Sequence, residues 1–165
     1  MDKIKLGLDL HGVIDKDPNF FATLSYHLRI EGHEVHILTG RELCDELLAQ
    51  LERFNVGYTE LFSITSYHKE IGTHVSYKDG DSNWPLIAPP KWDPTKAGYA
   101  ERVGLDLHID DSTIYGKFFE GKTQYLLYTP QVREFLRLMM GWTTRLDSQL
   151  KSLPGMFAFK GAVNL

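Results

Sequence analysis

Apolar and polar residues alternate along the chain in blocks that predict strands and helices in turn. Short runs rich in apolar and β-branched residues predict strands at 4–9, 34–39, 60–65, 105–110 and 124–129. Longer stretches with apolar residues at helical spacing predict helices at 19–31, 41–54, 96–103, 114–120 and 131–140. Such alternation is typical of a mainly parallel sheet with helices on both faces. We therefore expect an α/β fold: a three-layer α/β/α, Rossmann-like domain with a five-stranded sheet.

The segment 41–54 shows the helical pattern most clearly. Leu47 and Leu51 fall on one apolar stripe, and acidic residues surround it. Cys44 lies within the same pattern, so we expect it to have a structural role. Pro130 is expected to open the last helix, where the N–H group that proline lacks would have no helical partner.

The stretch 66–95 interrupts this alternation. It is rich in glycine and proline, and Pro89 and Pro90 exclude a regular helix or a central strand there. An ordered excursion over one end of the sheet would serve as a lid or substrate wall, or pack only on its own aromatic residues. Trp84 and Trp92 could stack on a nucleic-acid base, but anchoring to the core is the interpretation we favour.

Length and composition indicate one domain over residues 1–165, with an excursion at 66–95 and a tail at 141–165. The tail carries Trp142, Phe157 and Phe159, and it either packs back on the domain or pairs with another copy. The formal net charge of −4 argues against a strongly basic nucleic-acid surface.

The expected compartment follows from what the sequence lacks. No apolar run approaches the roughly 18–20 residues needed to span a bilayer, and the N-terminus does not read as a secretory signal. Cys44 is the only cysteine, so no internal disulfide can form. We expect a cytoplasmic protein with no membrane partner.

Polar side chains end three of the predicted strands. Asp9 ends the first, Thr39 the second, and Asp110 ends the fourth with Asp111 directly after it. The carboxyl ends of parallel strands are where open α/β sheets place their sites. Clustered carboxylates repel one another and need a cation or a shared proton, and oxygen-only ligands suit Mg²⁺ best. The sequence therefore predicts a magnesium site at this edge.

The same edge carries groups suited to phosphoryl chemistry. A carboxylate that faces a bound electrophile can act as a nucleophile and form an aspartyl-phosphate. The Thr39 hydroxyl and the Gly40 backbone N–H could hold phosphoryl oxygens at the start of the next helix. Lys96, near another predicted helix start, can supply a fixed positive charge.

These segments resemble, in order, the motifs of the haloacid dehalogenase superfamily. Residues 9–13 read Asp-Leu-His-Gly-Val, which is similar to the first motif, Asp-x-Asp-Gly-x. Thr39 matches the second motif, and the acid pair at 110–111 matches the fourth. Lys96 is the best placed for the third motif, with Lys91 close by. The resemblance covers most of the chain.

The resemblance implies a role for each matching residue. Asp9 would be the nucleophile that takes the phosphoryl group. Asp110 would bind Mg²⁺, and Asp111 would support the ion directly or through water. Thr39 would hydrogen-bond the phosphoryl group, while Lys96 would orient Asp9 and balance its charge.

His11 is a departure from the family pattern. Phosphatases of the family carry a second aspartate there, which serves as general acid and base. His11 can still give its backbone carbonyl to the metal, because every residue has one. As acid and base, His11 or Asp15 in the adjacent turn could serve, or the site could bind phosphate and turn over slowly. Other chemistry of the family, on phosphonates for example, stays open, but the acid pair disfavours a metal-free dehalogenase.

We therefore expect a Mg²⁺-dependent phosphomonoesterase that acts through an aspartyl-phosphate on Asp9. The alternative is a catalytically impaired protein that binds a phosphoryl ligand or a partner. No room for a large cap follows Gly12, and an open site admits a phosphorylated small molecule or the end of a macromolecule. Residues 39–42 also resemble the second motif of polynucleotide end-repair phosphatases, which keeps a nucleotide or nucleic-acid 3′-end phosphatase as a further alternative. By that resemblance Arg41 would belong to the active site, but an ion pair between Arg41 and a neighbouring acidic residue is the simpler interpretation.

Overall fold

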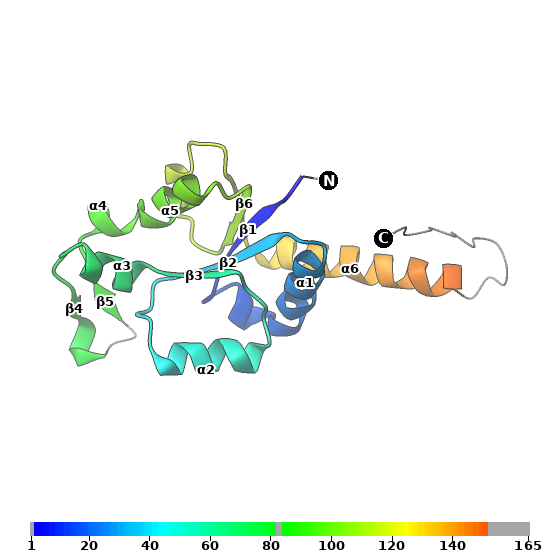
Figure 1. Ribbon diagram of the computed structural model, residues 1–165, viewed down its shortest axis with the longest axis horizontal. Helices are drawn as coiled ribbons and strands as arrows, with labels where there is room; N and C mark the ends of the chain where they lie inside the picture. Colours follow the sequence, from blue (N-terminus) through cyan, green and yellow to red (C-terminus); the bar gives the residue numbers. More distant parts are fainter. Residues whose placement is uncertain (1, 82–83, 152–165) are drawn as a thin grey trace, which may run out of the picture. The chain divides into compact units, whose positions relative to one another are not determined.

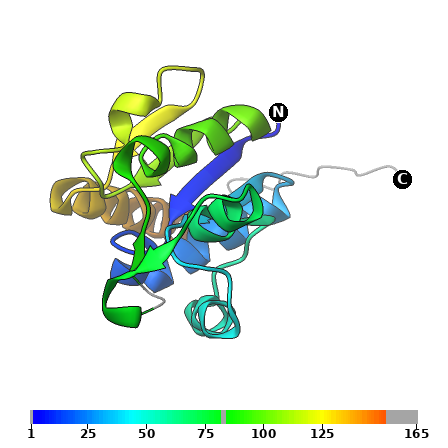
Figure 2. The same ribbon diagram turned by 90° about the vertical axis from the view of Figure 1, so that its left-hand side faces the viewer.

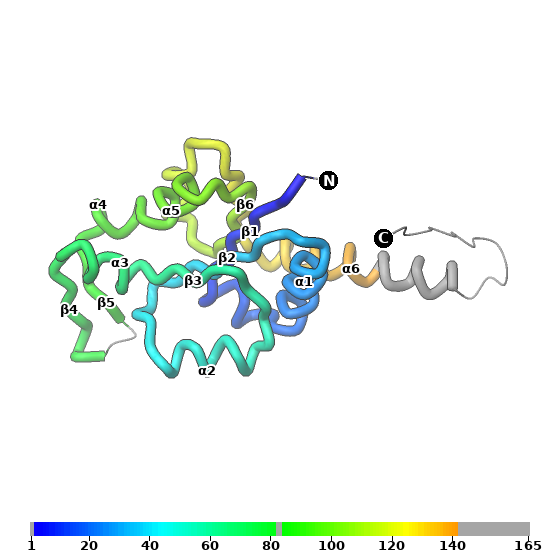
Figure 3. The backbone as a smooth tube through the Cα atoms, in the orientation of Figure 1, coloured from blue at the N-terminus to red at the C-terminus, as the bar shows by residue number. Residues whose placement is uncertain are grey.

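The computed structural model describes residues 2–81 and 84–151, with side chains described as far as Gly141 (Figure 1). Figure 3 follows the same backbone as a tube. The chain divides into two compact units, Met1–Thr129 and Pro130–Leu165. The first unit contains the sheet and every candidate site residue.

The first unit is built on the predicted five-stranded parallel sheet, with strand order β3-β2-β1-β6-β7. Each strand lies within its predicted range: β1 Lys5–Asp9, β2 Glu34–Thr39, β3 Glu60–Ser63, β6 Leu107–Asp110 and β7 Gln124–Leu127. The α/β fold class and the Rossmann-like architecture are therefore confirmed.

Helices cover both faces of this sheet. The α-helices are α1 Pro18–Ile30, α2 Asp45–Phe54, α3 Ile64–Glu70, α4 Pro89–Trp92, α5 Thr95–Val103 and, in the second unit, α6 Pro130–Lys151. The crossovers through α1 and α2 step outwards from β1, whereas the one through α5 returns past β1 to β6. Because such crossovers are right-handed, α5 lies on the opposite face from α1 and α2 (Figure 2).

Two predicted helices differ from the structure. The helix predicted at 41–54 begins only at Asp45, and Cys44 is an exposed, extended residue just before it. The helix predicted at 114–120 is a single 3₁₀ turn, η3 (Gly116–Phe118). Gly116 lies there against the ring of Tyr125, and a Cβ at this position would be only 3.0 Å from the ring.

The excursion at 66–95 is more regular than its composition predicts. The end of β3 leads directly into α3, because the Ser63 hydroxyl accepts a hydrogen bond from Ser66 N at 3.0 Å and caps the helix. The exclusion of helix at Pro89 and Pro90 is wrong, since both occupy the first turn of α4, where no N–H is needed. Two short strands, β4 (Ser76–Tyr77) and β5 (Pro85–Leu86), pair as a hairpin between these helices, around the 3₁₀ turn η2 (Lys78–Gly80).

The last helix opens at Pro130 as predicted and continues to Lys151, beyond the predicted end at 140. The predicted tail at 141–165 is therefore helical as far as it is described. Phe157, Phe159 and the side chain of Trp142 lie outside the described residues, so the packing of the tail stays a prediction, as does the single domain. None of the described helices has the length and apolar character needed to cross a membrane.

The register of the sheet sets the positions of the candidate residues. Leu8 pairs with Ile109, so Asp9 and Asp110 end their strands side by side. Asp9 in turn pairs with Leu38, one residue before Thr39. Because the direction of the crossovers changes between β1 and β6, these strand ends lie at the switch point where open α/β sheets form a crevice.

Candidate active site

A buried lysine links the two strand-end aspartates. Lys96 is the second residue of α5, and its Nζ donates to Asp9 Oδ1 at 2.5 Å and to Asp110 Oδ2 at 2.6 Å. The exposed fractions of Asp9, Lys96 and Asp110 are 5%, 3% and 1%. Because α5 precedes β6 and runs opposite to it, its first turn reaches the carboxyl edge of the sheet. The lysine predicted from the sequence thus lies beside both aspartates.

Asp111 and the turn after β1 complete the cluster. Oxygens of Asp9, Asp110 and Asp111 all lie within 4.8 Å of one another, and Asp111 is the exposed member. Gly12 has a φ of +94°, and a Cβ there would lie 2.0 Å from Asp111 Oδ2. A glycine is therefore needed both for the backbone conformation and for the room that Asp111 takes. Gly12 N also donates to Asp15 Oδ1 at 2.7 Å, which fixes the turn.

The donor set fits a divalent, oxygen-preferring cation. Three carboxylates and one ammonium leave two negative charges in a small volume, and a divalent ion would neutralise them. Carboxylate and carbonyl oxygens without nearby cysteine ligands suit Mg²⁺. Asp9, Asp110 and Asp111 could therefore hold the ion, and a contribution from the backbone carbonyl of His11 stays a prediction.

The two aspartates that share Lys96 differ in protonation. Burial, reinforced by the neighbouring charge of Asp110, raises the pKa of Asp9 to about 7 despite the opposing charge of Lys96. Burial acts in the same direction on Asp110, but hydrogen bonds from His108 and Lys96 hold its pKa below the usual range. Asp9 is therefore the carboxylate whose ionisation depends most on added positive charge.

Lys96 remains charged in this setting. Burial alone would lower its pKa, but Asp9 and Asp110 together raise the pKa of the ammonium above its ordinary value. Its Nζ also lies 5.1 Å from the ring centre of Tyr115, close enough for a cation–π contact. The lysine is thus a fixed cation at the floor of the site.

His108 and Tyr115 are site residues that the sequence interpretation missed. His108 is fully buried and its Nε2 lies 3.2 Å from Asp110 Oδ2, while Ser112 N donates to Asp110 Oδ1 at 2.9 Å. The period of a strand could have revealed His108, because it lies two residues before Asp110 and therefore on the same face. No comparable signal identifies Tyr115, whose position depends on the loop after β6.

A cavity of about 730 Å³ opens onto these residues. It brings together predicted residues from distant parts of the sequence: Asp9, His11, Gly40, Arg41, Lys96, Asp110 and Asp111. Thr39 is not among the lining residues. It is fully buried, and its hydroxyl accepts a hydrogen bond from Arg41 N at 3.2 Å. Its contact with a phosphoryl group stays a prediction.

Arg41 is held against α2. Its Nη1 donates to Gln50 Oε1 at 2.9 Å, and its Nη2 lies 3.8 Å from Glu46 Oε2. This agrees with the interpretation that Arg41 pairs with a neighbouring acid. The same guanidinium nevertheless lines the cavity, so it adds positive charge near the position where a phosphate would bind.

His11 lies on the cavity wall and is half-buried. Burial lowers its pKa, and the charge of Asp15 offsets this only in part, while Arg41 lowers the pKa further. The imidazole is therefore mostly neutral near pH 7 and is better suited to accept a proton than to donate one. Its catalytic role stays a prediction.

The two tryptophans of the excursion differ. Trp92 packs against the core cluster that includes Phe62 and Tyr99, so the anchoring expected for it is confirmed. Trp84 lines the cavity with an exposed fraction of 63%, so anchoring is wrong for this residue.

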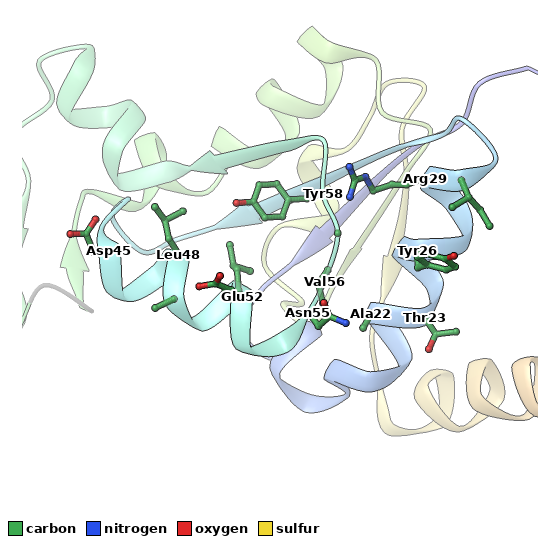
Figure 4. Close-up of a pocket in the computed structure, with 14 residues that line it drawn as sticks. Ala22, Thr23, Tyr26, Arg29, Asp45, Leu48, Glu52, Asn55, Val56 and Tyr58 are labelled. Carbon is green, nitrogen blue, oxygen red and sulfur yellow. The ribbon is translucent and has the colours of Figure 1, made fainter.

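A second, larger cavity of about 1100 Å³ lies between α1 and α2 (Figure 4). Tyr26 and Arg29 line it from α1, and Asp45 and Glu52 from α2. The charged groups of this groove are all exposed, and none of them forms a buried cluster like that around Lys96. We call it the α1–α2 groove.

Comparisons with known proteins add little beyond this geometry. No family model matches the chain, and no curated protein matches it. Among solved structures, the chain is similar to the core domain of a proposed phosphoglycolate phosphatase from Streptococcus pneumoniae TIGR4, determined by NMR. The identity is 15%, the match covers 83% of this chain and 97% of that one, and the TM-score is 0.47.

Proposed function

We propose that this protein is a Mg²⁺-dependent phosphomonoesterase that acts through an aspartyl-phosphate on Asp9. The observation that carries the proposal is the buried Asp9–Lys96–Asp110 cluster at the floor of the cavity, with Asp111 in reach. Burying charged groups costs free energy, so a fold rarely keeps them without a function that needs them. Clustered carboxylates with shifted pKa values in a cleft are typical of functional sites.

The reaction proposed for Asp9 has two steps. A carboxylate oxygen of Asp9 attacks phosphorus and the bond to the alcohol oxygen breaks, which leaves an acyl phosphate on Asp9 and a free alcohol. Water then attacks the same phosphorus, inorganic phosphate leaves, and the carboxylate is restored. The first step needs Asp9 ionised, although its pKa without a divalent cation is about 7.

The remaining residues supply charge and position. Asp9, Asp110, Asp111 and the His11 carbonyl would hold the Mg²⁺ ion, which when bound offsets the negative charge of the carboxylates and of the phosphoryl oxygens. Lys96 holds Asp9 in place and keeps a positive charge beside it. Gly40 N–H and Arg41 lie at the wall where phosphoryl oxygens would bind.

We assign the proton transfers to His11. The leaving alcohol needs a proton in the first step, and the attacking water loses one in the second. Asp15 is a weaker candidate because its carboxylate already accepts the hydrogen bond from Gly12 N. Since burial lowers the pKa of His11, its protonated form is scarce at neutral pH, and we expect aryl phosphates to react faster than alkyl phosphates.

The test is hydrolysis of p-nitrophenyl phosphate by the purified chain with Mg²⁺ and with EDTA. We expect activity only with Mg²⁺, and its loss in the Asp9→Asn variant. A wild-type protein that is inactive under all conditions, or a variant that keeps full activity, would overturn the proposal.

A binding protein without turnover is the second candidate, and His11 is the observation that favours it. The position carries a group that is a poor acid at neutral pH. The His11→Asp variant separates the two candidates. A large gain of activity indicates an impaired site in the natural chain, whereas a loss of activity indicates that His11 is the working acid and base.

A further inference from the structure

Three aromatic side chains line the active-site cavity, and together we call them its aromatic wall. Trp84 comes from the β4–β5 hairpin, Trp92 from α4 and Tyr115 from the segment after β6. The cavity volume of about 730 Å³ is that of a site for a whole small molecule, far more than a phosphate group fills. The aromatic wall therefore borders a space large enough for the leaving group of a phosphomonoester as well as the phosphate.

Two of these rings are already held by neighbours. Trp92 Nε1 donates to the Tyr115 hydroxyl at 2.9 Å, and the Trp92 ring lies so close to Gly40 that a Cβ there would be 2.9 Å from it. Tyr115 meets Lys96 in the cation–π contact. Trp84 differs, because 63% of it is exposed although it lines the cavity. Its ring is the part of the wall that is open to a ligand.

The hairpin that carries Trp84 is fixed to the body of the first unit. The Tyr77 hydroxyl hydrogen-bonds to Glu42, and Lys69 Nζ donates to the same carboxylate at 2.6 Å. Within the hairpin, Lys78 N donates to the Trp84 carbonyl at 3.0 Å. Trp84 thus follows a backbone that is hydrogen-bonded to Lys78, which reduces the conformational entropy lost when a ligand binds.

The charges of the cavity indicate a small ligand. Within the described part of the chain, Lys96 and Arg41 are the only lysine or arginine residues that line it. Lys96 is paired with two aspartates, and Arg41 lies where the single phosphoryl group would bind, so neither is left for further phosphates. A polynucleotide end would bring further backbone phosphates, which proteins bind through additional lysine and arginine residues.

We propose that the leaving group of the substrate carries a flat aromatic ring that stacks on Trp84, as a nucleoside monophosphate does. This inference rests on the proposed phosphomonoesterase function and narrows its substrate class. It favours mononucleotides over nucleic-acid ends. Stacking of a base on an aromatic side chain tolerates different bases, so we expect purine and pyrimidine nucleotides to be accepted alike.

The experiment compares kcat/KM for adenosine 5′-monophosphate and ribose 5-phosphate, which differ only by the base. We expect the wild type to prefer the nucleotide at least about tenfold. Trp84→Ala should reduce this preference about 5- to 100-fold, the range that the loss of one base stack produces. Trp84→Phe should retain most of it, because a ring remains. Tyr26→Ala is the control, since Tyr26 is equally exposed at 63% but lies in the α1–α2 groove.

Equal kcat/KM values for the two substrates, or an unchanged preference in Trp84→Ala, would overturn the stacking inference and leave the phosphatase proposal intact. A better rate on 3′-phosphorylated oligothymidine than on thymidine 3′-monophosphate would overturn it in favour of nucleic-acid ends. A wild type that hydrolyses none of these substrates and not p-nitrophenyl phosphate would overturn the proposed function, and this inference with it.

Discussion

The two cavities of the first unit differ in how deeply their charged residues are buried. The α1–α2 groove is the larger, at about 1100 Å³ against about 730 Å³ for the active-site cavity. Its acids and its arginine all lie in water, whereas Asp9, Lys96 and Asp110 are almost fully buried. Volume alone would select the α1–α2 groove. Buried charge is the better guide, because solvation opposes it and a fold keeps it only where neighbours compensate.

The sheet explains why the charges gather in one cavity. Three parallel strands end side by side at the switch point, and the first turn of α5 reaches the same edge. The α1–α2 groove lies instead between two neighbouring helices (Figure 4), where no strand end points. The comparison predicts that matched substitutions in the two cavities have very different effects.

The largest difference should appear when an acid becomes an amide. Asp9→Asn removes the proposed nucleophile, so we expect kcat on p-nitrophenyl phosphate to fall at least about 10³-fold. Glu52→Gln makes the same change in the α1–α2 groove and should leave kcat within about twofold, since that groove contains no part of the proposed machinery. Similar losses in both variants would mean that the active-site cavity has no special role.

The next effect is on the free energy of unfolding when a basic residue is replaced by methionine. Lys96→Met leaves two buried carboxylates without their partner, and we expect the free energy of unfolding in EDTA to fall by about 3–5 kcal/mol. Urea denaturation measures it, and added Mg²⁺ should restore part of the loss by replacing the missing charge. The matched variant Arg29→Met changes an exposed residue of the α1–α2 groove and should cost less than about 1 kcal/mol. A stable Lys96→Met protein in EDTA would contradict the electrostatic account.

The third effect is a dependence of stability on pH. In EDTA the unfolded chain releases the Asp9 proton near pH 4, whereas the folded protein keeps it up to about pH 7. At Asp9 the folded state therefore binds more protons over this interval, so Asp9 by itself makes stability fall as the pH rises, by at most about 1.4 kcal/mol per pH unit. His11, His68 and His108 act in the opposite direction, because burial lowers their pKa values, so the Asp9 contribution is measured as a difference between variants. Urea titrations between pH 4 and 7 test this. Relative to the wild type, Asp9→Asn should change the slope towards greater stability at higher pH, and Glu52→Gln should leave the slope unchanged.

The smallest effect concerns the hairpin that carries Trp84. Tyr77→Phe removes a hydroxyl that hydrogen-bonds to Glu42, and we expect a loss of about 0.5–1.5 kcal/mol in the free energy of unfolding. Hydrogen exchange should increase at residues 76–81 and 84–86 and stay unchanged in α1. Tyr58→Phe, the matched change in the α1–α2 groove, should have no effect at the hairpin. Equal exchange in both variants would show that the Glu42 contact does not fix the hairpin.

The pattern of the sequence predicted most of the sheet and most of the buried cluster. Apolar runs that end in Asp9, Thr39 and Asp110 define strand ends, and parallel register then places them together. Asp111 was found because it directly follows such an end. Lys96 was found because it lies next to a predicted helix start and is the lysine best placed for the third motif of the resemblance.

The features that the sequence could not reveal depend on contacts between distant segments. The start of α3 depends on the Ser63 cap, which is indistinguishable in the sequence from a strand residue. Tyr115 is defined by its bond to Trp92 and by Lys96, which only the folded chain brings together. The sequence likewise offered no reason to distinguish Trp84 from Trp92, and both were expected to anchor to the core, although only Trp92 packs on it.

The most direct test of the central claim is a crystal structure of the protein with Mg²⁺ and beryllium fluoride, which mimics a phosphoryl group on a carboxylate. We predict a trifluoroberyllate bonded to an oxygen of Asp9, with Mg²⁺ about 2.0–2.1 Å from oxygens of Asp9 and Asp110. An unmodified Asp9, with the fluoride or the metal bound elsewhere, would contradict the account.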